Sequence, residues 1–523
     1  MDENEYLGYL LQLRQEAIDD AVHREVQDKE LLEYYFGEPF GDEVEGQSSV
    51  VSTDVSDVVE SDMPSYVRVF LGGNELLKFT PNTESEKDVQ EAEEKTRYVN
   101  WIVRNQENAF KKYSDWMKEA DLMKSGGIIK YRWDETEITK EHRYKGVSSE
   151  EAVILMESLQ DDDIEVEVES NEENEDGSRD ITFKSMRVNK GVSIDNVPAE
   201  NFLITYAACM QECELVGDWS QRSRGWLISQ GYDEDVVKDL VLDTAPTGTT
   251  IKAYRNDSYL MQLQGLQQNI TTGINHWASQ KVIVYDLYPL IDRDGDGIPE
   301  RRHVVMVGNT ILLDEPFCRA PYAHLSAIST PHSIIGRSRG EITKSTQRIK
   351  SVVLRQTLDN IYRVNSSRVV ATSDVNLDDL SVVRPAGVVR AKKGTILSQS
   401  VMPLVTEYIG DKALQVIQYV DTARAQSTGV NLANQSLSSD SLHKETATRF
   451  EGVQAKGDEK IELVVRNFAE TGWKELFEGV AWLVFTLVLL LVLLLTLVLA
   501  FVLVSQSRSR FFSRVWFRVL FRC

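Results

Sequence analysis

The stretch PHSIIGRSRGEITKSTQRIKSVVLRQTLDNIYRVNSSR, from Pro331 to Arg368, predicts one long helix that follows a short turn. Apolar residues recur along it at helical spacing and form a stripe of the kind that normally faces a core. The stripe consists of Ile342, Ile349, Val353, Leu358, Ile361 and Val364. At 3.6 residues per turn the helix has about seven turns. The rest of the chain is organised before and after this helix.

The face opposite the stripe is basic. Between Arg337 and Arg368 there are eight Lys or Arg residues and two acids, Glu341 and Asp359, a local charge of +6, whereas the whole chain carries −25. A long basic helix in so acidic a protein is expected to meet an acidic partner surface or phosphate. The alternative is a solvated helix face, which normally mixes the two signs.

Length and composition indicate a globular protein of several domains. The 523 residues suffice for two to four core-bearing units, and 27% charged with 9% aromatic residues do not suit a disordered chain. Four cysteines are too few for a disulfide framework and indicate a reducing compartment. Cys209 and Cys213 stand one helical turn apart, and we interpret them as a structural pair. The N-terminus lacks the features of a signal peptide. The acidity argues against wrapping on DNA, which needs clustered cations.

The first part of the chain is predicted to be helical. Residues 1–36 predict one or two helices, and Pro64 is expected to interrupt the segment that starts at Ser48. A second helical region spans Glu84 to Lys124. Its buried face is expected to comprise Val89, Ala92, Val99, Trp101, Ile102 and Trp116.

Strands dominate the next part. They are predicted at Gly127–Ile138, in an acidic hairpin at Leu159–Arg179, at Gly191–Ile204, at Ser279–Ile291 and in a hairpin at Arg301–Glu315 that turns at Gly308-Asn309. A short helix is expected at Asp233–Leu242. Because strands and helices mix without βαβ periodicity, the fold class is α+β.

Two motifs suggest chemistry. Gly336-Arg-Ser338-Arg-Gly340 has the nucleophile-elbow pattern of hydrolases, but His443 is the only histidine downstream, and Ser338 is better interpreted as a helix N-cap. The arginines on either side of it suit helix entry or phosphate contact. We expect no enzymatic activity and no cofactor.

The loop from Asp292 to Gly297, DRDGDG, matches the first half of an EF-hand calcium loop. Asp292, Asp294 and Asp296 are therefore weak metal candidates. Position 12 is His303 in place of the bidentate Glu, so a simple hairpin turn is the favoured interpretation.

The C-terminal tail, residues 485–523, differs from the rest. Val480 to Val504 contains 25 residues broken only by Thr486 and Thr496, followed by arginines, which is the pattern of a membrane span. From Phe485 onward, however, Asp, Glu, Lys, Asn, Gly, Pro and Ile are all missing. A membrane span, a barrel-lining tail and an artefact such as a frame shift all stay open.

Several pieces resemble portal proteins of short-tailed, podovirus-type bacteriophages. They include Gly336-Arg337-Ser338 and the ladder from Gln347 to Arg368 in the long helix. Further pieces are SSVVSTDVSDVVESDMPS from Ser48, PAENFLI from Pro198, DRDGDGIPERR from Asp292, NLDDL from Asn376, RPAG from Arg384, ETAT from Glu445 and FAETG from Phe468. Their order makes the resemblance specific over roughly residues 1–480.

The resemblance implies a portal-protein fold with an α/β wing, long stem helices, a small β-containing clip and a C-terminal helical region, assembled as a ring. It implies a wing over residues 1–335, a stem helix over 336–368, a clip over 369–404, a returning stem helix over 405–428, a tunnel loop over 429–444 and a C-terminal helix at the base of the crown over 445–484.

The resemblance also implies a function. A ring of twelve subunits would replace one capsid vertex of the virion, pass double-stranded DNA, and dock terminase and then tail or adaptor proteins. It would contact capsid and scaffolding proteins and assemble in the host cytoplasm. Candidate DNA-channel or subunit contacts are Lys344, Arg348, Arg355, Asn431, Asn434 and Lys444. The alternative is a single-pass membrane protein with an acidic cytosolic domain.

Overall fold

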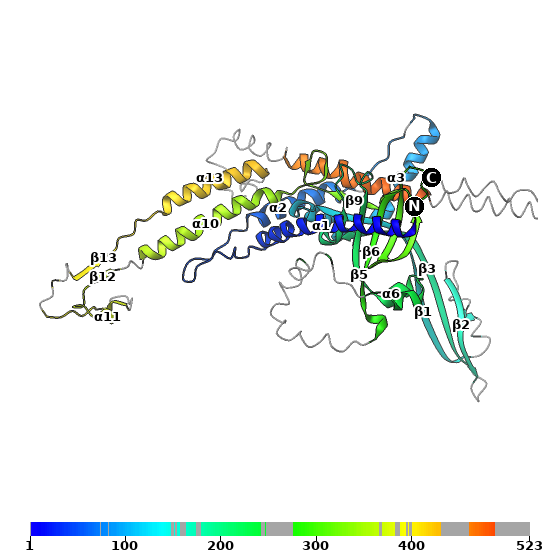
Figure 1. Cartoon of the computed structure of the whole chain (residues 1–523), viewed down its shortest axis with the longest axis horizontal. Helices are drawn as coiled ribbons and strands as arrows, with labels where there is room; N and C mark the ends of the chain where they lie inside the picture. Colours follow the sequence, from blue (N-terminus) through cyan, green and yellow to red (C-terminus); the bar gives the residue numbers. More distant parts are fainter. Residues whose placement is uncertain are drawn as a thin grey trace, which may run out of the picture.

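The protein was analysed as a computed structural model, in which a compact body carries a two-helix stem on one side and a β-sheet arm on another (Figure 1). Apart from residues 74 and 82, the structure describes residues 2–147, 164–173, 179–241, 276–365, 369–381, 388–393, 400–429 and 460–486, and a few single residues between these ranges. Helices and strands mix as predicted, so the α+β class is confirmed.

Four helices form the N-terminal part of the body. They are α1 (Glu3–Phe36), α2 (Asp54–Phe70), α3 (Glu86–Arg104) and α4 (Ala109–Leu122). Pro64 lies inside α2 and does not interrupt it, so that prediction was wrong. The burial of Val58, Val59 and Met63 holds the helix together around the missing hydrogen bond. The second helical region breaks at Asn108, which takes a left-handed conformation with φ 55°.

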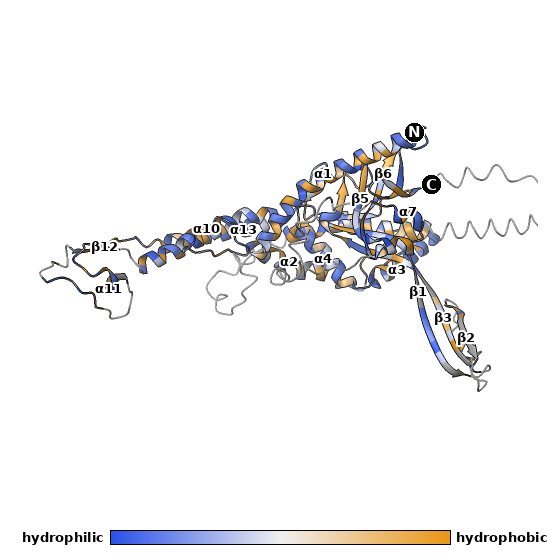
Figure 2. Cartoon of the chain, turned by 60° about the horizontal axis from the view of Figure 1, so that its bottom comes forward, coloured by the Kyte–Doolittle hydropathy of each residue, from blue (hydrophilic) through white to orange (hydrophobic). Residues whose placement is uncertain are grey.

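One β-sheet extends from the body as an arm. Its strand order is β2-β3-β1-β9, with β1 (Gly127–Val147), β2 (Ile164–Glu173), β3 (Arg179–Val197) and β9 (Tyr322–Leu325). The outer parts of β1, β2 and β3 leave the body together (Figures 1 and 2). The acidic hairpin is confirmed as β2 paired with β3, while residues 174–178 between them lie outside the described part of the chain.

A second, five-stranded antiparallel sheet lies in the body. Its order is β4-β5-β6-β7-β8, with β4 (Phe202–Ile204), β5 (Leu215–Ser223), β6 (Lys281–Ile291), β7 (Glu300–Val307) and β8 (Thr310–Pro316). The turn between β7 and β8 at Gly308 has φ 58°, as the Gly-Asn pair predicts. Short helices accompany this sheet: η1 (Ala199–Asn201), α6 (Arg224–Ser229), α7 (Glu234–Lys238) and η2 (Trp277–Ser279).

The core consists of separate clusters between these layers. Helix α1 packs its Leu10 and Leu13 against Trp219 and Leu287 of the five-stranded sheet. A larger cluster joins α2, α3 and α4 to β1, β9 and the C-terminal helical residues, with Trp116 and Trp473 in ring contact at 5.1 Å. Trp101, predicted to be buried here, is 59% exposed and stacks on Tyr98, because the buried face of α3 is carried by Val99, Ile102 and Val103 instead.

The remaining elements build the stem and its two ends. A short pair, β10 (Ile328–Thr330) and β11 (Ser333–Arg337), leads into α10 (Arg339–Asn365). At the far end lie β12 (Val369–Ala371), α11 (Leu377–Ser381) and β13 (Val401–Pro403), and α13 (Gly410–Thr428) returns beside α10 (Figure 1). Residues 460–486 are helical, with a π-helical turn, η3, at Ala469–Trp473.

Candidate functional site: the stem and its attachment to the body

Helix α10 begins as an ordinary capped helix. The Ser338 hydroxyl is buried and accepts a hydrogen bond from the Glu341 N–H at 3.0 Å, which confirms the predicted N-cap. Gly340 lies against α4, where a Cβ atom would come within 2.9 Å of the Leu122 carbonyl oxygen. A serine used in this way does not support the hydrolase hypothesis, and His443, the histidine required there, lies outside the described residues.

Arg339 is an internal ion-pair residue. Its guanidinium donates to Asp121 Oδ1 at 2.6 Å, makes further close contacts with the second Asp121 oxygen and with Asp62, and donates to the Tyr66 hydroxyl at 2.7 Å. Burial lowers the pKa of Arg339 to about 9. Burial also raises the pKa of Asp121 well above its ordinary value. Arg339 is the first residue of α10, which agrees with the expected role in helix entry, but its buried guanidinium pairs with Asp62 and Asp121 and does not suit phosphate contact.

The buried face of α10 is polar. Every fourth residue from Arg339 is buried, and these residues form a polar stripe that faces the body. The polar stripe consists of Arg339, Thr343, Gln347, Ser351 and Arg355. The apolar stripe predicted to face a core is half-buried or exposed, with Ile349 53% exposed. The prediction failed because side-chain hydrogen bonds satisfy the polar groups inside, as when Gln347 accepts from Val55 N–H at 2.8 Å and donates to the Tyr34 carbonyl at 2.8 Å.

Asp54, at the start of α2, connects both stem helices to the body. It is fully buried, accepts a hydrogen bond from Lys350 of α10 at 2.9 Å and contacts the Arg424 guanidinium of α13. Lys350 also donates to Asp421 of α13 at 2.8 Å. Because each charge here has an opposite partner, the network can hold charged groups in the interior that would be costly alone.

The candidate contact residues on α10 have different surroundings. Lys344 donates to Glu30 of α1 at 2.8 Å, and Arg348 is exposed beside Tyr34. Arg355 is buried and donates to Val50, Asp42 and Glu43. Their roles in DNA or subunit contact stay predictions. Asn431, Asn434 and Lys444 lie outside the described residues.

The returning stem helix begins at Gly410, not at Val405. The Asn360 side chain of α10 donates to the Glu407 carbonyl at 2.9 Å and accepts from the Ile409 N–H at 3.1 Å. These contacts hold the backbone before Gly410 in a non-helical path. The predicted clip region does contain a small β pair, β12 with β13, in its described residues.

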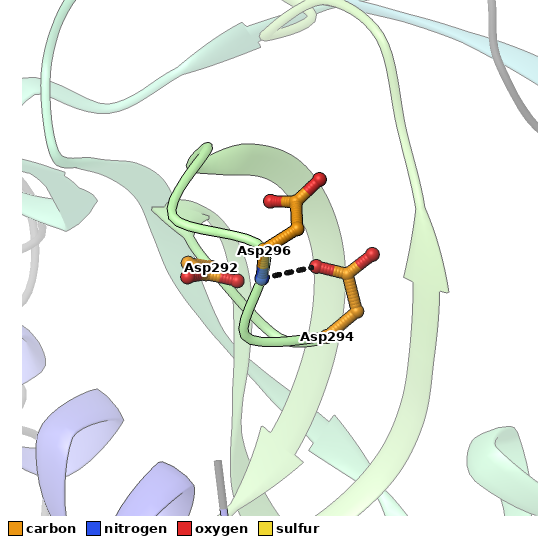
Figure 3. Close-up of side chains that lie close together, drawn as sticks. All are labelled: Asp292, Asp294 and Asp296. Carbon is orange, nitrogen blue, oxygen red and sulfur yellow. Dashed lines mark hydrogen bonds between the residues drawn. The ribbon is translucent and has the colours of Figure 1, made fainter.

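The Asp292 loop is a hairpin turn between β6 and β7 (Figure 3). Asp292 accepts from the Gly295 and Gly297 N–H groups at 2.6 and 2.8 Å, and Asp294 accepts from the Asp296 N–H at 3.3 Å. These hydrogen bonds lower the pKa of Asp292, with the Gly297 N–H contributing most. Carboxylate oxygens of Asp292, Asp294 and Asp296 lie within 4.8 Å of one another. His303, at position 12 of the calcium-loop pattern, does not contact these carboxylates in the described structure; its ring nitrogens lie 3.0 Å from Asp286 and Glu315. The predicted hairpin turn is therefore present, and the role of Asp292, Asp294 and Asp296 as weak metal candidates stays a prediction.

A buried charge cluster between the two sheets was not predicted. Lys130 of β1 donates to Asp218 and Asp286 of the five-stranded sheet, both at 2.6 Å, and the Tyr322 hydroxyl donates to Asp218 at 2.5 Å. The signal in the sequence was a lysine within the otherwise apolar run GIIKYRW. Burial is the largest single effect on the pKa of His303 and lowers it, but the hydrogen bond and charge of Asp286 together with the hydrogen bond to Glu315 outweigh burial, so the pKa is raised overall.

Cys209 and Cys213, which were interpreted as a structural pair, lie in the turn before β5, and only the buried Cys213 fits that interpretation. Cys213 is buried, and its thiol donates to the Met210 carbonyl at 2.9 Å, whereas Cys209 is exposed. Burial raises the pKa of the Cys213 thiol to about 11. These surroundings suit a structural cysteine and not a reactive thiolate.

The structure has a body, a projecting pair of stem helices and a small β unit at the tip of the stem. The sequence resemblance implies this arrangement, and a comparison with protein families identifies the family of the chain. The family model of the phage SU10 portal protein matches residues 9–486, so the chain belongs to this family. It is thus a phage portal protein, a structural component of the virion. No curated protein matches the chain.

The family match ends where the described residues end, at residue 486. Most of the apolar stretch from Val480 to Val504 lies beyond this point, together with residues 505–523. Within the described part of the chain, no helix combines the length and apolarity that a bilayer crossing requires.

Proposed function

We propose that this chain is the ring subunit of the phage portal vertex, with twelve copies enclosing the channel for packaging and ejecting double-stranded DNA. The ring docks terminase during packaging and tail or adaptor proteins afterwards, and it contacts capsid and scaffolding proteins. It assembles in the host cytoplasm and remains at the portal vertex of the virion. Family membership supports this proposal, and one observation on the stem carries it.

That observation is the distribution of apolar side chains on the stem. The polar stripe of α10 is buried within the subunit, while apolar side chains of both stem helices lie at the surface. They are Ile349 and Tyr362 on α10 and Leu414, Val416 and Tyr419 on α13, of which Tyr419 is 76% exposed. Figure 2 shows hydrophobic positions interspersed along both stem helices. Such a group of exposed apolar side chains on a projecting helix pair favours a protein partner. Neighbouring stems in a ring would cover them.

The charge of the chain suits a DNA channel. At −25 per subunit, most surfaces repel the phosphate backbone, so DNA slides past them. The few exposed cations on the stem, such as Arg348, then make weak and salt-sensitive contacts. In this proposal the tunnel loop with Asn431, Asn434 and Lys444 adds to them.

The proposal is tested by ring formation. We expect the variant Leu414→Asp/Tyr419→Asp to fold but to remain monomeric in native mass spectrometry and negative-stain images, because two charges would be buried between stems. The control is Ile298→Asp, at a 65% exposed side chain in the Asp292 loop, which should form normal rings. Normal rings from the stem variant would overturn the proposed subunit contact.

Single substitutions on α10 distinguish cations that support ring assembly from cations that contact DNA. Arg355→Ala removes the ion pairs that a buried guanidinium makes with Asp42 and Glu43, and it should reduce ring yield. Arg348→Ala should leave the ring intact but weaken DNA packaging in a salt-dependent way. Lys344→Ala removes a half-exposed pair with Glu30, and we expect a small effect on assembly. Normal packaging by all three variants at two ionic strengths would show that this face is only solvated.

A further inference from the structure

The loop that joins α1 to α2, residues 37–53, runs along the stem. Figure 1 shows it reaching from the body beside α10 and returning. Its returning limb contacts α10 in reverse order: Ser52 N–H donates to the Ser351 hydroxyl at 3.0 Å, the Val50 carbonyl accepts from Arg355 at 2.9 Å, and Ser48 N–H donates to Asp359 at 2.7 Å. The loop therefore lies antiparallel to the middle of the helix.

Arg355 binds both limbs of this loop. Its Nε donates to Val50 on the returning limb, while its two terminal nitrogens donate to Asp42 at 2.8 Å and Glu43 at 2.5 Å on the outgoing limb. Glu43 is itself held by the backbone N–H groups of Phe40 and Gly41, both at 2.8 Å. The fixed fork of the guanidinium makes it suited to joining three acceptors in one geometry.

The contacts of this loop with α10 are mainly polar. Val44 and Val50 of the loop are exposed, and Phe40 packs on the Arg355 guanidinium with its ring centroid 5.0 Å away. Since little apolar surface is buried between loop and helix, the loop is held mostly by charge and hydrogen bonds. Such contacts weaken with ionic strength far more than a hydrophobic interface does.

Among the described residues, side-chain hydrogen bonds and ion pairs from α10 to the body come from the first half of the helix. Arg339, Lys344 and Gln347 bind groups of α1, α2 and α4, and Lys350 binds Asp54. From residue 351 to residue 365, the side-chain hydrogen bonds and ion pairs within the described structure go to the loop, to residues 407–409 or to the helix itself. On the returning helix, Asp421 and Arg424 lie at the body end.

We propose that the α1–α2 loop is a releasable clamp on the stem, with Arg355 as the positioning residue. When the clamp is closed, the far half of α10 is fixed to the body. When it opens, that half moves together with the clip about the attachment at Lys350 and Asp54, while the attachment itself stays intact. This inference rests on the proposed portal function, because a stem that changes position matters only in a working channel.

Hydrogen exchange of the full chain tests the clamp. The variant Asp42→Asn/Glu43→Gln removes both acidic partners of Arg355 with little change in shape. We expect exchange in residues 351–365 to rise roughly threefold to tenfold, the range for losing two partly exposed ion pairs, while residues 339–347 stay unchanged. Raising salt from about 0.1 to about 1 M should have the same effect on the unmodified chain.

The matched control neutralises two acids elsewhere. Asp374→Asn/Asp379→Asn removes the same charge at exposed ion pairs with Lys392 and Arg390 in the clip region, and it should leave exchange in α10 unchanged. Unchanged exchange in the loop variant, or a rise spread over the whole of α10, would overturn the proposal. The first result would show that the loop does not hold the helix, and the second that it only adds general stability.

A disulfide separates the clamp from the portal function. The residues Ser52 and Ser351 are in contact, since the Ser52 backbone N–H donates to the Ser351 hydroxyl at 3.0 Å, so the variant Ser52→Cys/Ser351→Cys is designed to link the loop to α10. We expect the oxidised protein to form rings but to package less DNA than the same protein after reduction. Equal packaging in both states would refute release of the clamp. Failure of the unmodified chain to form rings would refute the proposed function, and the exchange experiment would still decide the clamp.

Discussion

Replacing Arg339 by alanine tests whether the stem is attached to the body by a compensated buried charge. The substitution leaves Asp62 and Asp121 without a cation, and their side chains are 4% and 0% exposed. It also removes the hydrogen bond that Arg339 donates to the Tyr66 hydroxyl. The loss of stability of this variant therefore measures the free-energy cost of burying two unpaired carboxylates.

Removing one partner of a buried ion pair costs about 3–5 kcal/mol. At roughly 2–4 °C per kcal/mol for a large domain, this corresponds to a melting temperature lower by roughly 6–20 °C. The loss also depends on pH. An unpaired buried carboxyl has a folded-state pKa above its unfolded value, so it destabilises most at high pH and protonation relieves the cost as the pH falls. The variant should be closest to the unmodified protein near pH 5.

The assay is thermal unfolding of the full chain between pH 5 and pH 8. Arg337→Ala is the matched control, because that exposed arginine makes one ion pair within the described residues, with Glu341 at 3.3 Å, and its loss should cost less than about 1 kcal/mol. The triple variant Arg339→Met/Asp62→Leu/Asp121→Leu should recover most of the stability, since apolar residues can replace a buried ion cluster. If Arg339→Ala and Arg337→Ala have the same melting temperature at pH 8, then Asp62 and Asp121 do not become costly buried charges when Arg339 is removed, and the reasoning fails.

Three further outcomes follow from the structure. Millimolar calcium should raise the melting temperature by less than about 5 °C, because Asp292 already accepts two loop N–H groups; a larger rise that Asp294→Ala abolishes would reverse this conclusion. His303→Gln should cost most stability near pH 6 and least above pH 8, because a raised folded-state pKa stabilises only while the histidine is protonated, which a pH series of melting curves checks. A chain that ends at residue 486 should remain soluble and form rings, since the family match ends there; aggregation or a permanent monomer by native mass spectrometry would show that the tail is integral.

Much of the fold could be predicted because local signals agreed with it. Gly308-Asn309 marks a turn that the structure places between β7 and β8, and the apolar alternation before it marks β6. The same local signals failed at Pro64 and at Trp101. In both cases tertiary packing decides: neighbouring side chains hold α2 across the proline, and α3 is rotated so that Val99 and Val103 face the core.

The buried charge clusters are harder to predict. Lys130 meets Asp218 and Asp286 because strands of two separate sheets come into contact in the fold, and these residues are 88 and 156 positions away in sequence. An isolated lysine in an apolar strand indicates that a buried partner is needed, but it does not identify the partner. Arg339 is also hard to predict, because its partners come from α2 and α4, far away in sequence. Its neighbour Ser338 lies in a sequence pattern that suggests catalysis, not a buried ion pair.

The stem shows what hydrophobic periodicity does and does not determine. The period of Ile349, Val353 and Leu358 correctly indicates a helix, since 3.6-residue spacing is a property of the local backbone. The same pattern was wrong about which face the subunit buries, because Gln347, Ser351 and Arg355 find polar partners inside it. Periodicity identifies the face that avoids water in the working assembly, whichever chain supplies the cover. In the proposed ring a neighbouring stem supplies the cover for the part of this face that is exposed, such as Ile349. The polar stripe then attaches α10 to its own body, and the exposed apolar side chains of the stem contact the next subunit.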